Sequence, residues 1–542
     1  MTRFLLRIAM IALALAPVCL DAQTKTNKVT VLDGPENDTK RSSVLGMFGY
    51  DQTGYYTMRY EKKKILVEHL NGSMTVDKSV EREELSVGKE DLGFLAAVQL
   101  EEKFYFLYTL HDSKTKVVTL YYKNFNRSTL MTEGELHEMA SETFVSTRSF
   151  MQKAAFAYFS PFTALASEDK TRLLLITRNS TGAEESEEGS QIEMKLTVFD
   201  SEMKKEWDLD AKTGFNSDLF SVTNIRLDDN GDVSIVGVEY KEKLTNKQLR
   251  RNEKPQYTHH LIRYTEQGSK MMSMPIELNG KFITDLRIET APSGDIVVAG
   301  FYSEKGSFSI KGAFYLSIDP VTETIKAQEF SEFGTEFITL NFTDREEKKA
   351  KKKEDKGEEL EMNEFDMRDL ILKGDGGATL IAEQYIFYVT SHTTYSNGKS
   401  STTYVYHYLY NDIIVVSFGN TGELLWKTKI PKRQHTTNDG GMWSSYAMAV
   451  VGDKLFFIFN DNPKNLFLGK DEAPYSFAGS RDLAVVLVEV DAEGKATKEL
   501  LFTTERGDAM VRPKIAEQTG ENEMVICSQR SKIFQYSKLT FK

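Results

Sequence analysis

The sequence predicts an all-β chain in which one structural unit is repeated along the whole length. Three observations lead to this prediction: short runs of β-branched and aromatic residues, turns of Gly, Asp and Asn between them, and the regular recurrence of both. Of the 542 residues, 40% are hydrophobic and 11% are aromatic, whereas only 11 are Pro. This composition excludes disordered, collagen-like and membrane-bundle chains.

The repeated unit is a turn followed by an apolar strand, and it occurs eight times. Each copy is preceded by a short strand and followed by two more, as residues 313–319 and 324–330 follow the fifth copy. The eight copies begin at Gly54, Lys103, Thr171, Gly231, Gly294, Gly377, Gly452 and Asn522.

Four antiparallel strands per unit, repeated around a ring, are the pattern of a β-propeller blade. We predict eight blades, with seven as the alternative. The last unit has room for only two strands after Asn522, whereas residues 28–32 form a strand without a neighbour in sequence. We therefore expect this N-terminal strand to pair with the tail of the chain and close the ring. A string of β-sandwich domains is the rival fold, but no Pro/Ser-rich linker separates the units.

The first 22 residues have the pattern of a secretory signal peptide. Arg3 and Arg7 precede an apolar run that is too short to span a bilayer, and Ala22 is a small residue at the cleavage position. Cys19 leaves open the alternative of a lipoprotein. We expect residues 23–542 to form a single exported β-propeller domain, in the periplasm or on the surface of a bacterium, with no transmembrane segment.

The net charge limits the classes of ligand that the chain is expected to bind, and the cysteine content limits its disulfide chemistry. The net charge of −12 disfavours nucleic acid and leaves a protein or a glycan as the expected ligand. Cys527 is the sole cysteine after cleavage, so no internal disulfide forms, and its apolar neighbours predict a buried, inert thiol. No motif predicts a metal site, a cofactor or a catalytic residue, and the oligomeric state is left open.

Two insertions interrupt the repeats. The first, at about 344–362, is rich in Lys and Glu and predicts a solvated helix or a disordered loop, with a docking arm as the alternative. The second, at about 386–410, has Tyr- and Thr-rich strands on either side of an Asn-Gly turn, which predicts a β-hairpin. Either it displays Tyr404 and Tyr406 to a partner or it covers the edge of a blade.

The connection between the sixth and seventh units concentrates polar and aromatic side chains. We expect the propeller to bring it near the residues that follow the next strand, so that both form one binding patch. The alternative is that the Asn and Asp residues satisfy their own turns. The candidate residues are His435, Asn438, Asp439, Trp443, Asn460, Asp461 and Asn462.

Two acidic residues, Glu239 and Glu383, fall at corresponding places in apolar strands of the fourth and sixth units. We expect both to line the central channel, where carboxylates bind cations or act as acid/base groups. The alternative is that both residues lie at strand ends that are exposed to water in the channel and have no function.

Four phrases, at 300–303, 312–315, 430–434 and 459–462 (GFYS, GAFY, IPKRQ and FNDN), resemble an uncharacterised family of exported bacterial β-propeller-like proteins. The resemblance covers about half of the chain. It implies repeats and an envelope location, and no reaction or ligand.

The sequence thus favours a noncatalytic binding or scaffolding propeller, although an enzyme is not excluded. The alternative is a glycan-active hydrolase or lyase that uses Glu383, Glu239, His435 or Asp461. That function requires two of these carboxylates within about 5–10 Å in one pocket.

Overall fold

The computed structural model describes residues 26–38, 42–143, 160–178, 191–216, 218–243, 255–306, 309–396, 399–469, 471–477, 483–504, 509–530 and 532–542. The predicted signal peptide with Cys19, and the turn at 397–398, lie outside these residues. No helix among the described residues combines the length and the apolar character that crossing a bilayer requires.

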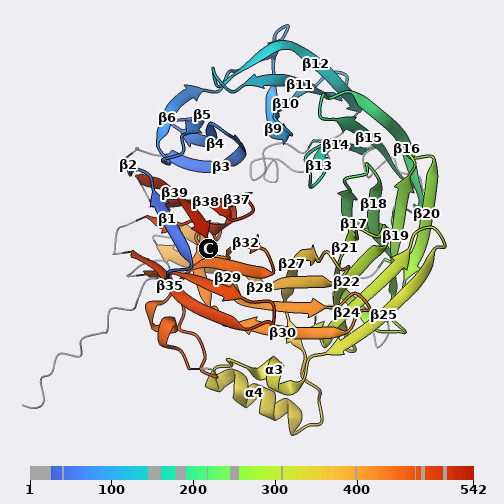
Figure 1. The fold of residues 1–542 in the computed structure, drawn as a ribbon, viewed down its shortest axis with the longest axis vertical. Helices are drawn as coiled ribbons and strands as arrows, with labels where there is room; N and C mark the ends of the chain where they lie inside the picture. The colour runs from blue at the N-terminus through green and yellow to red at the C-terminus, as the bar shows by residue number, and fades with distance from the viewer. Residues whose placement is uncertain are drawn as a thin grey trace, which may run out of the picture.

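The chain is a β-propeller, as predicted. Among the described residues, eight antiparallel sheets of four to six strands follow one another around a central axis (Figure 1). In the first seven sheets the first strand in the chain lies next to the axis and the following strands lie farther out, whereas in the eighth sheet the N-terminal strand Val29–Asp33 is at the outer end. No sheet runs continuously around the ring, and the blade number and the closure of the ring stay predictions.

The strands of the first four sheets are β3 (Ser42–Asp51), β4 (Gly54–Glu61), β5 (Lys64–Leu70), β6 (Val76–Glu81); β9 (Gly93–Leu100), β10 (Lys103–Asp112), β11 (Val117–Asn126), β12 (Met131–Thr143); β13 (Phe162–Ala166), β14 (Arg172–Arg178), β15 (Gln191–Asp200), β16 (Lys205–Asn216); and β17 (Phe220–Leu227), β18 (Val233–Tyr240), β19 (Tyr257–Thr265), β20 (Lys270–Ile276).

The strands of the next three sheets are β21 (Phe282–Thr290), β22 (Ile296–Ser303), β24 (Gly312–Asp319), β25 (Thr324–Glu332); β27 (Phe365–Leu372), β28 (Ala378–Ser396), β29 (Lys399–Phe418), β30 (Leu424–Ile430), β31 (Gln434–Thr437); and β32 (Ala447–Val451), β33 (Lys454–Asp461), β34 (Leu483–Val490), β35 (Ala496–Thr504).

The eighth sheet joins both ends of the chain: β36 (Met510–Val511), β37 (Glu517–Gly520), β38 (Glu523–Arg530), β39 (Ile533–Phe541), β1 (Val29–Asp33) and β2 (Asn37–Asp38). The remaining elements are the strand pairs β7 (Ser86–Val87) with β8 (Glu90–Asp91) and β23 (Ser309–Ile310) with β26 (Met362–Asn363), the helices α3 (Thr335–Thr339) and α4 (Asp344–Glu354), and the 3₁₀ turns η1 (Pro463–Phe467) and η2 (Pro513–Ile515).

Each of the eight predicted copies is the second strand of its sheet: β4, β10, β14, β18, β22, β28, β33 and β38. Seven of these strands are buried along most of their length, and β28 is buried over residues 378–383, because these parts lie inside a sheet that is covered on both faces by neighbouring sheets. Burial on both faces explains why they read as continuous apolar runs rather than as alternating ones.

The expected pairing of the chain ends is present. β1 runs antiparallel to β39, with Val29 opposite Phe541 and Asp33 opposite Ser537. The eighth sheet also packs on the first, since Val44 and Tyr55 share a buried cluster with Val525 and Tyr536. The free thiol of Cys527 belongs to this cluster, and burial raises its pKa to about 12.

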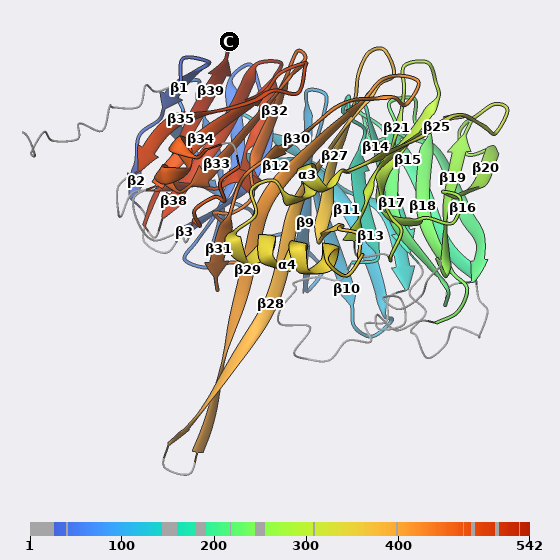
Figure 2. The ribbon, with the colours of Figure 1, turned by 90° about the horizontal axis from the view of Figure 1, so that it is seen from below.

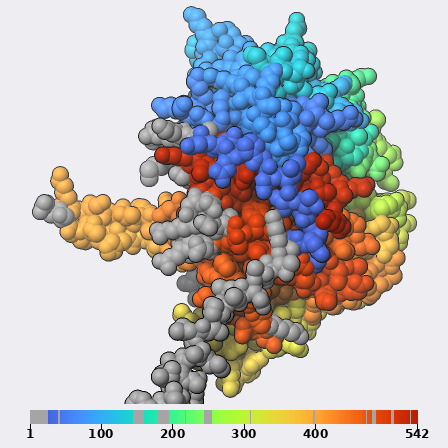
Figure 3. Space-filling model, turned by 60° about the vertical axis from the view of Figure 1, so that its left-hand side comes forward, coloured from blue at the N-terminus to red at the C-terminus, as the bar shows by residue number. Residues whose placement is uncertain are grey.

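The two insertions adopt different structures. Residues 344–354 form α4, which begins with a capping box in which Thr343 and Glu346 bond each other's backbone N–H groups. The second insertion is the outer part of β28 and β29, which continue far beyond the body of the propeller (Figures 2 and 3).

Candidate functional site

A hairpin that is exposed along most of its length projects from the body of the propeller (Figure 2). We call residues 386–409 the arm: β28 and β29 pair there from Ile386 opposite Leu409 to Ser396 opposite Lys399. Lys399 is the sole Lys, Arg, Asp or Glu in this segment, although 27% of the whole chain is charged. The predicted hairpin is therefore confirmed, and it stands away from the blades instead of covering one (Figure 2).

One face of the arm carries a row of aromatic rings. Alternate residues share a face of a ribbon, which places Phe387 and Tyr395 on the same side as Tyr404, Tyr406 and Tyr408. The exposed fractions are 47% for Phe387, 82% for Tyr395, 56% for Tyr404 and 45% for Tyr406. Large apolar rings at this level of exposure are typical of a contact surface rather than of a stable solvent face.

Both edges of the outer part of the arm lack a neighbouring strand in the described structure. β27 pairs with β28 only as far as Gln384, and the backbone N–H of Tyr385 then donates to Glu364. On the other side, β31 pairs with β29 from Tyr410 to His407. Asn438 extends this contact by one residue through two hydrogen bonds to the backbone of Tyr406. Beyond these points the backbone groups on each edge are open to another strand.

The root of the arm contains two of the predicted patch residues. His435 Nε2 lies 3.0 Å from Nδ1 of His407, whose Nε2 lies 2.9 Å from the Thr390 hydroxyl. Burial, and then the neighbouring His407, lower the pKa of His435. Asn438 bonds the backbone of Tyr406 twice, once through its N–H and once through its side-chain oxygen. The patch and the arm thus form one continuous region.

The other patch residues mainly support the fold. Asn460 and Asp461 are completely buried. Asn460 donates to the carbonyls of Trp443 and Val511, and Asp461 accepts from Asn465 and Lys498. The structure does bring the two predicted stretches together, but burial removes these two side chains from contact with a ligand.

Three further patch residues also bond the protein itself. Trp443 donates from its ring N–H to the carbonyl of Gln529, at 3.0 Å. Asp439 accepts from the Thr436 hydroxyl and the Gly441 N–H, and Asn462 accepts from the N–H of Lys464 at the start of η1. These bonds agree with the alternative that the Asn and Asp residues satisfy their own turns.

Glu383 forms a buried network that sequence reasoning missed. Its Oε1 lies 2.7 Å from Lys432 Nζ and its Oε2 accepts from the Ser445 hydroxyl at 2.7 Å. Lys432 also donates to the Tyr410 carbonyl and to Gln434. Burial lowers the pKa of Lys432, while the attraction of Glu383 opposes this shift. The signal in the sequence was an acidic residue in an apolar strand, which requires a buried base.

A second lysine lies beside the same network on η2. Lys514 Nζ donates to the Tyr410 hydroxyl at 2.7 Å and stands 4.2 Å from the centre of that ring. Burial lowers the pKa of Lys514 to about 8. No sequence motif marks this residue, because the contact joins positions 104 residues apart.

A cavity of about 780 Å³ occupies the axis of the propeller, lined by residues of β13, β17, β21, β27 and β32. Its wall includes Arg226 and Glu289, which form an ion pair at 2.6 Å. Burial raises the pKa of Glu289 to about 8. The positive charge of Arg226 opposes this shift, and the nearby carboxylates add to it. The lining therefore mixes both signs of charge.

The expectation that Glu239 and Glu383 line the channel is not met at this cavity. Glu383 is fully buried behind Arg368, which does line the cavity and reaches Glu383 Oε2 at 3.2 Å. Glu239 lies in β18, is 44% exposed and contacts His260 at 3.0 Å. The two carboxylates therefore have different surroundings: Glu383 is enclosed by neighbouring elements, whereas Glu239 is open to solvent.

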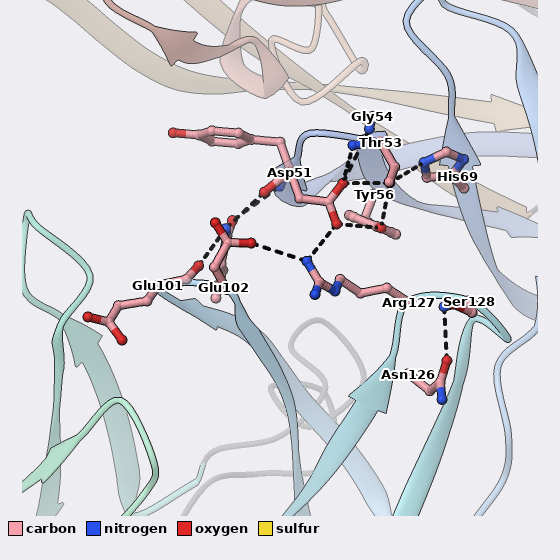
Figure 4. A network of polar contacts seen from close by, with 12 residues as sticks. Asp51, Thr53, Gly54, Tyr56, His69, Glu101, Glu102, Asn126, Arg127 and Ser128 are labelled. Carbon is pink, nitrogen blue, oxygen red and sulfur yellow. Dashed lines mark hydrogen bonds and ion pairs between the residues drawn. The ribbon is translucent and has the colours of Figure 1, made fainter.

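A second cavity of about 780 Å³ lies over the first and second sheets (Figure 4). There His69 stands between Asp77, at 2.7 Å, and the Thr53 hydroxyl, at 3.3 Å. This order resembles a hydrolytic triad, but the Thr53 hydroxyl also donates to Asp51 at 2.5 Å. The Thr53 hydroxyl directs its proton to Asp51 and not to His69, so the network stabilises a turn.

Asp51 is held as a carboxylate by its surroundings. Burial opposes ionisation, but hydrogen bonds from Thr53, Tyr56 and Arg127 outweigh it and lower the pKa of Asp51. Across the described ranges, no group of three His, Cys, Asp or Glu side chains is arranged to hold a metal ion.

No family model and no curated protein matches the chain. Among solved structures, it is similar to prolyl oligopeptidase B from Galerina marginata (9% identity over 91% of this chain, TM-score 0.38), and it spans 56% of the length of that protein. It is also similar to the Dos1 propeller (8% identity, 94% of this chain and 95% of the other, TM-score 0.39). A third similar structure is the propeller domain of the Trilobed protease from Pyrococcus furiosus (11% identity, 87% and 98%, TM-score 0.33). At these scores the likenesses carry no information about activity, and the family of the chain is not established.

Proposed function

We propose that this chain is an exported, noncatalytic β-propeller that serves as a binding or scaffolding module in a bacterial envelope, and that its arm is the contact surface for a protein partner. Export rests on the signal-peptide pattern of residues 1–22. The observation that carries the binding function is the arm itself, a ribbon with exposed aromatic rings and a single charged residue, Lys399, in an acidic chain.

A protein is favoured over a glycan because the arm offers backbone as well as side chains. Strand addition uses free N–H and C=O groups along an edge, and alternate side chains then supply specificity. The arm has such edges next to Tyr395 and Tyr404. A glycan would use the rings and hydroxyls alone and would leave the backbone groups to water.

The placement of the acidic candidates supports a noncatalytic role. Glu383 is paired with Lys432 and Asp461 with Lys498, and neither carboxylate is exposed. Glu239 is in another sheet, in contact with His260. A glycan-active enzyme requires an accessible pair of carboxylates in one pocket, and Glu239, Glu383 and Asp461 do not form such a pair.

The experiment compares the intact chain with a variant in which residues 391–404 are replaced by Asn-Gly. This replacement keeps Thr390 opposite Val405 and retains the contacts of His407 and Asn438 at the root. With extracts of the host envelope as the source of partner, we expect the intact chain to recover one defined protein in a fixed ratio and the shortened chain to lose it.

A matched control is the double variant Tyr404→Ser/Tyr406→Ser, which keeps the ribbon and removes two exposed rings. We expect it to weaken capture roughly tenfold or more, while its melting temperature stays within about 2 °C of the parent. Equal recovery by the shortened chain, or turnover on a panel of glycans, would overturn the proposal.

A further inference from the structure

Along one edge of the arm, the backbone N–H and C=O groups of every second residue point outward. Tyr406 exchanges both of its backbone hydrogen bonds with Asn438, so its N–H and C=O point away from β28. Val389 is opposite Tyr406, and the members of such a pair both point outward. The alternation of an antiparallel ladder then directs residues 387, 389, 391, 393 and 395 toward the free edge of β28.

These five residues form a series that is symmetric about its centre. In chain order they are Phe387, Val389, Ser391, Thr393 and Tyr395: aromatic, β-branched, serine, β-branched, aromatic. An antiparallel copy of the same edge, aligned on Ser391, places Phe387 opposite Tyr395 and Val389 opposite Thr393. Aromatic pairs and β-branched pairs are the cross-strand neighbours that stabilise a sheet.

From this symmetry we propose that the arm binds a second copy of this chain, by antiparallel pairing of the two β28 edges about a two-fold axis at Ser391. The proposal rests on the proposed function, because it assigns a partner to the same arm. Pairing in this register satisfies every outward group of the series, on the order of ten backbone hydrogen bonds.

Charge favours the arm as the place where two copies meet. The chain has a net charge of −12, so two bodies repel each other. The arm extends for 11 residues on each strand, about 35 Å, whereas the screening length at physiological salt is about 8 Å. Antiparallel pairing over residues 387–395 therefore keeps the two bodies at opposite ends of the contact, about 30 Å or several screening lengths apart. No Lys, Arg, Asp or Glu lies between 387 and 395.

The edge also lacks the features that protect an exposed strand from association. Natural edges are blocked by Lys, Pro, bulges or inward charges. Residues 387–395 contain no Lys or Pro, and the register opposite β29 is regular from Tyr385 outward. The opposite edge of the arm is shorter, because β31 and Asn438 cover β29 as far as Tyr406.

Proline substitutions test the choice of edge. Pro at 391 removes an outward N–H and leaves the ladder between β28 and β29 intact. By sedimentation equilibrium at about 100 µM chain, we expect the parent to form a reversible dimer and Ser391→Pro to remain a monomer. Thr402→Pro removes an outward N–H on the β29 edge and should dimerise like the parent. A monomeric parent, or a dimeric Ser391→Pro variant, would overturn the proposal.

Cysteine substitutions test the register. Cα atoms of a hydrogen-bonded pair are about 5.5 Å apart, within the range of a disulfide. Ser391→Cys should cross-link to itself under mild oxidation, with roughly tenfold more disulfide dimer than Thr393→Cys alone. A mixture of Val389→Cys and Thr393→Cys chains should cross-link to each other. Equal self-cross-linking by Thr393→Cys would contradict the register.

The result separates this inference from the proposed function. If the parent is monomeric but shortening the arm still abolishes capture from the extract, the inference fails and the proposed function stands. If the chain dimerises through Ser391 and no other protein depends on the arm, self-association is the binding function of the arm.

Discussion

Lys432 Nζ lies 2.7 Å from Glu383 Oε1, and neither side chain is accessible to solvent. The pair connects β28, just inside the root of the arm, with the segment that leads into β31. Through Arg368 it also reaches the wall of the central cavity. The arm is therefore anchored to the channel wall by a buried ionic contact.

Breaking this pair should destabilise the protein strongly. In Lys432→Met the Glu383 carboxylate loses its closest base and stays buried, which costs about 3–5 kcal/mol of unfolding free energy. Urea unfolding measures the loss. The double variant Glu383→Leu/Lys432→Met buries no charge and should recover much of it. A single variant within about 0.5 kcal/mol of the parent would contradict the role of the pair.

Acid should destabilise the protein through His259. Burial, and then His260, lower the pKa of His259 from 6.5 to about 4. The folded state therefore binds this proton more weakly than the unfolded state. The stabilisation is present above pH 6.5 and disappears as the pH falls from 6.5 to about 4, by about 3 kcal/mol in all.

The measurement is the unfolding free energy of the parent and of His259→Gln across this pH range. Gln cannot take up the proton, so the variant should show a flatter profile. Parallel profiles would show that other groups cause the acid sensitivity.

The N-terminal strand should contribute to stability through one face. Val29 is buried in the cluster between the seventh and eighth sheets, whereas Leu32 on the same strand is 42% exposed. Val29→Asp places an unpaired charge in the core and should cost about 2–4 kcal/mol, while Leu32→Asp stays within about 0.5 kcal/mol. Thermal and urea unfolding of both variants test this, and equal effects would contradict the burial of β1.

Lys514 should be unusually reactive toward acylating reagents. At pH 8 about half of its side chain is neutral, because burial lowers its pKa to about 8, whereas an ordinary lysine remains protonated. Mass spectrometry after brief treatment with acetic anhydride should find Lys514 labelled early. Tyr410→Ala admits water and should slow the labelling, and an unchanged rate would show that the tyrosine does not set the pKa.

Much of the fold followed from local patterns. The eight apolar copies became the second strands of eight sheets because strands buried on both faces must be apolar throughout. The Asn-Gly turn between Thr-rich runs indicated the hairpin of the arm, since this dipeptide suits a two-residue loop. The unpaired strand at the N-terminus indicated its pairing with β39, because exposed edges are unfavourable.

The candidate site was harder to predict. Asn460 and Asp461 look like ligand-binding residues in sequence, but both are buried and bonded to the protein. Hydrogen-bonding capacity does not reveal whether the partner is the chain itself or a ligand. Lys432 and Lys514 carry no local signal, since their partners come from other strands.

The sequence by itself determined that this protein is a β-propeller of repeated sheets, with one Tyr-rich hairpin that carries a single charged residue inserted in the sixth unit. These properties are local, because the apolar pattern of a strand, the residues of a turn and the charge of a segment each depend on residues that are consecutive in the sequence. Only the tertiary structure decided that the hairpin projects, that Glu383 is sealed behind Arg368, and which arm residues face outward. Those properties depend on contacts between residues distant in sequence, and no local pattern encodes them.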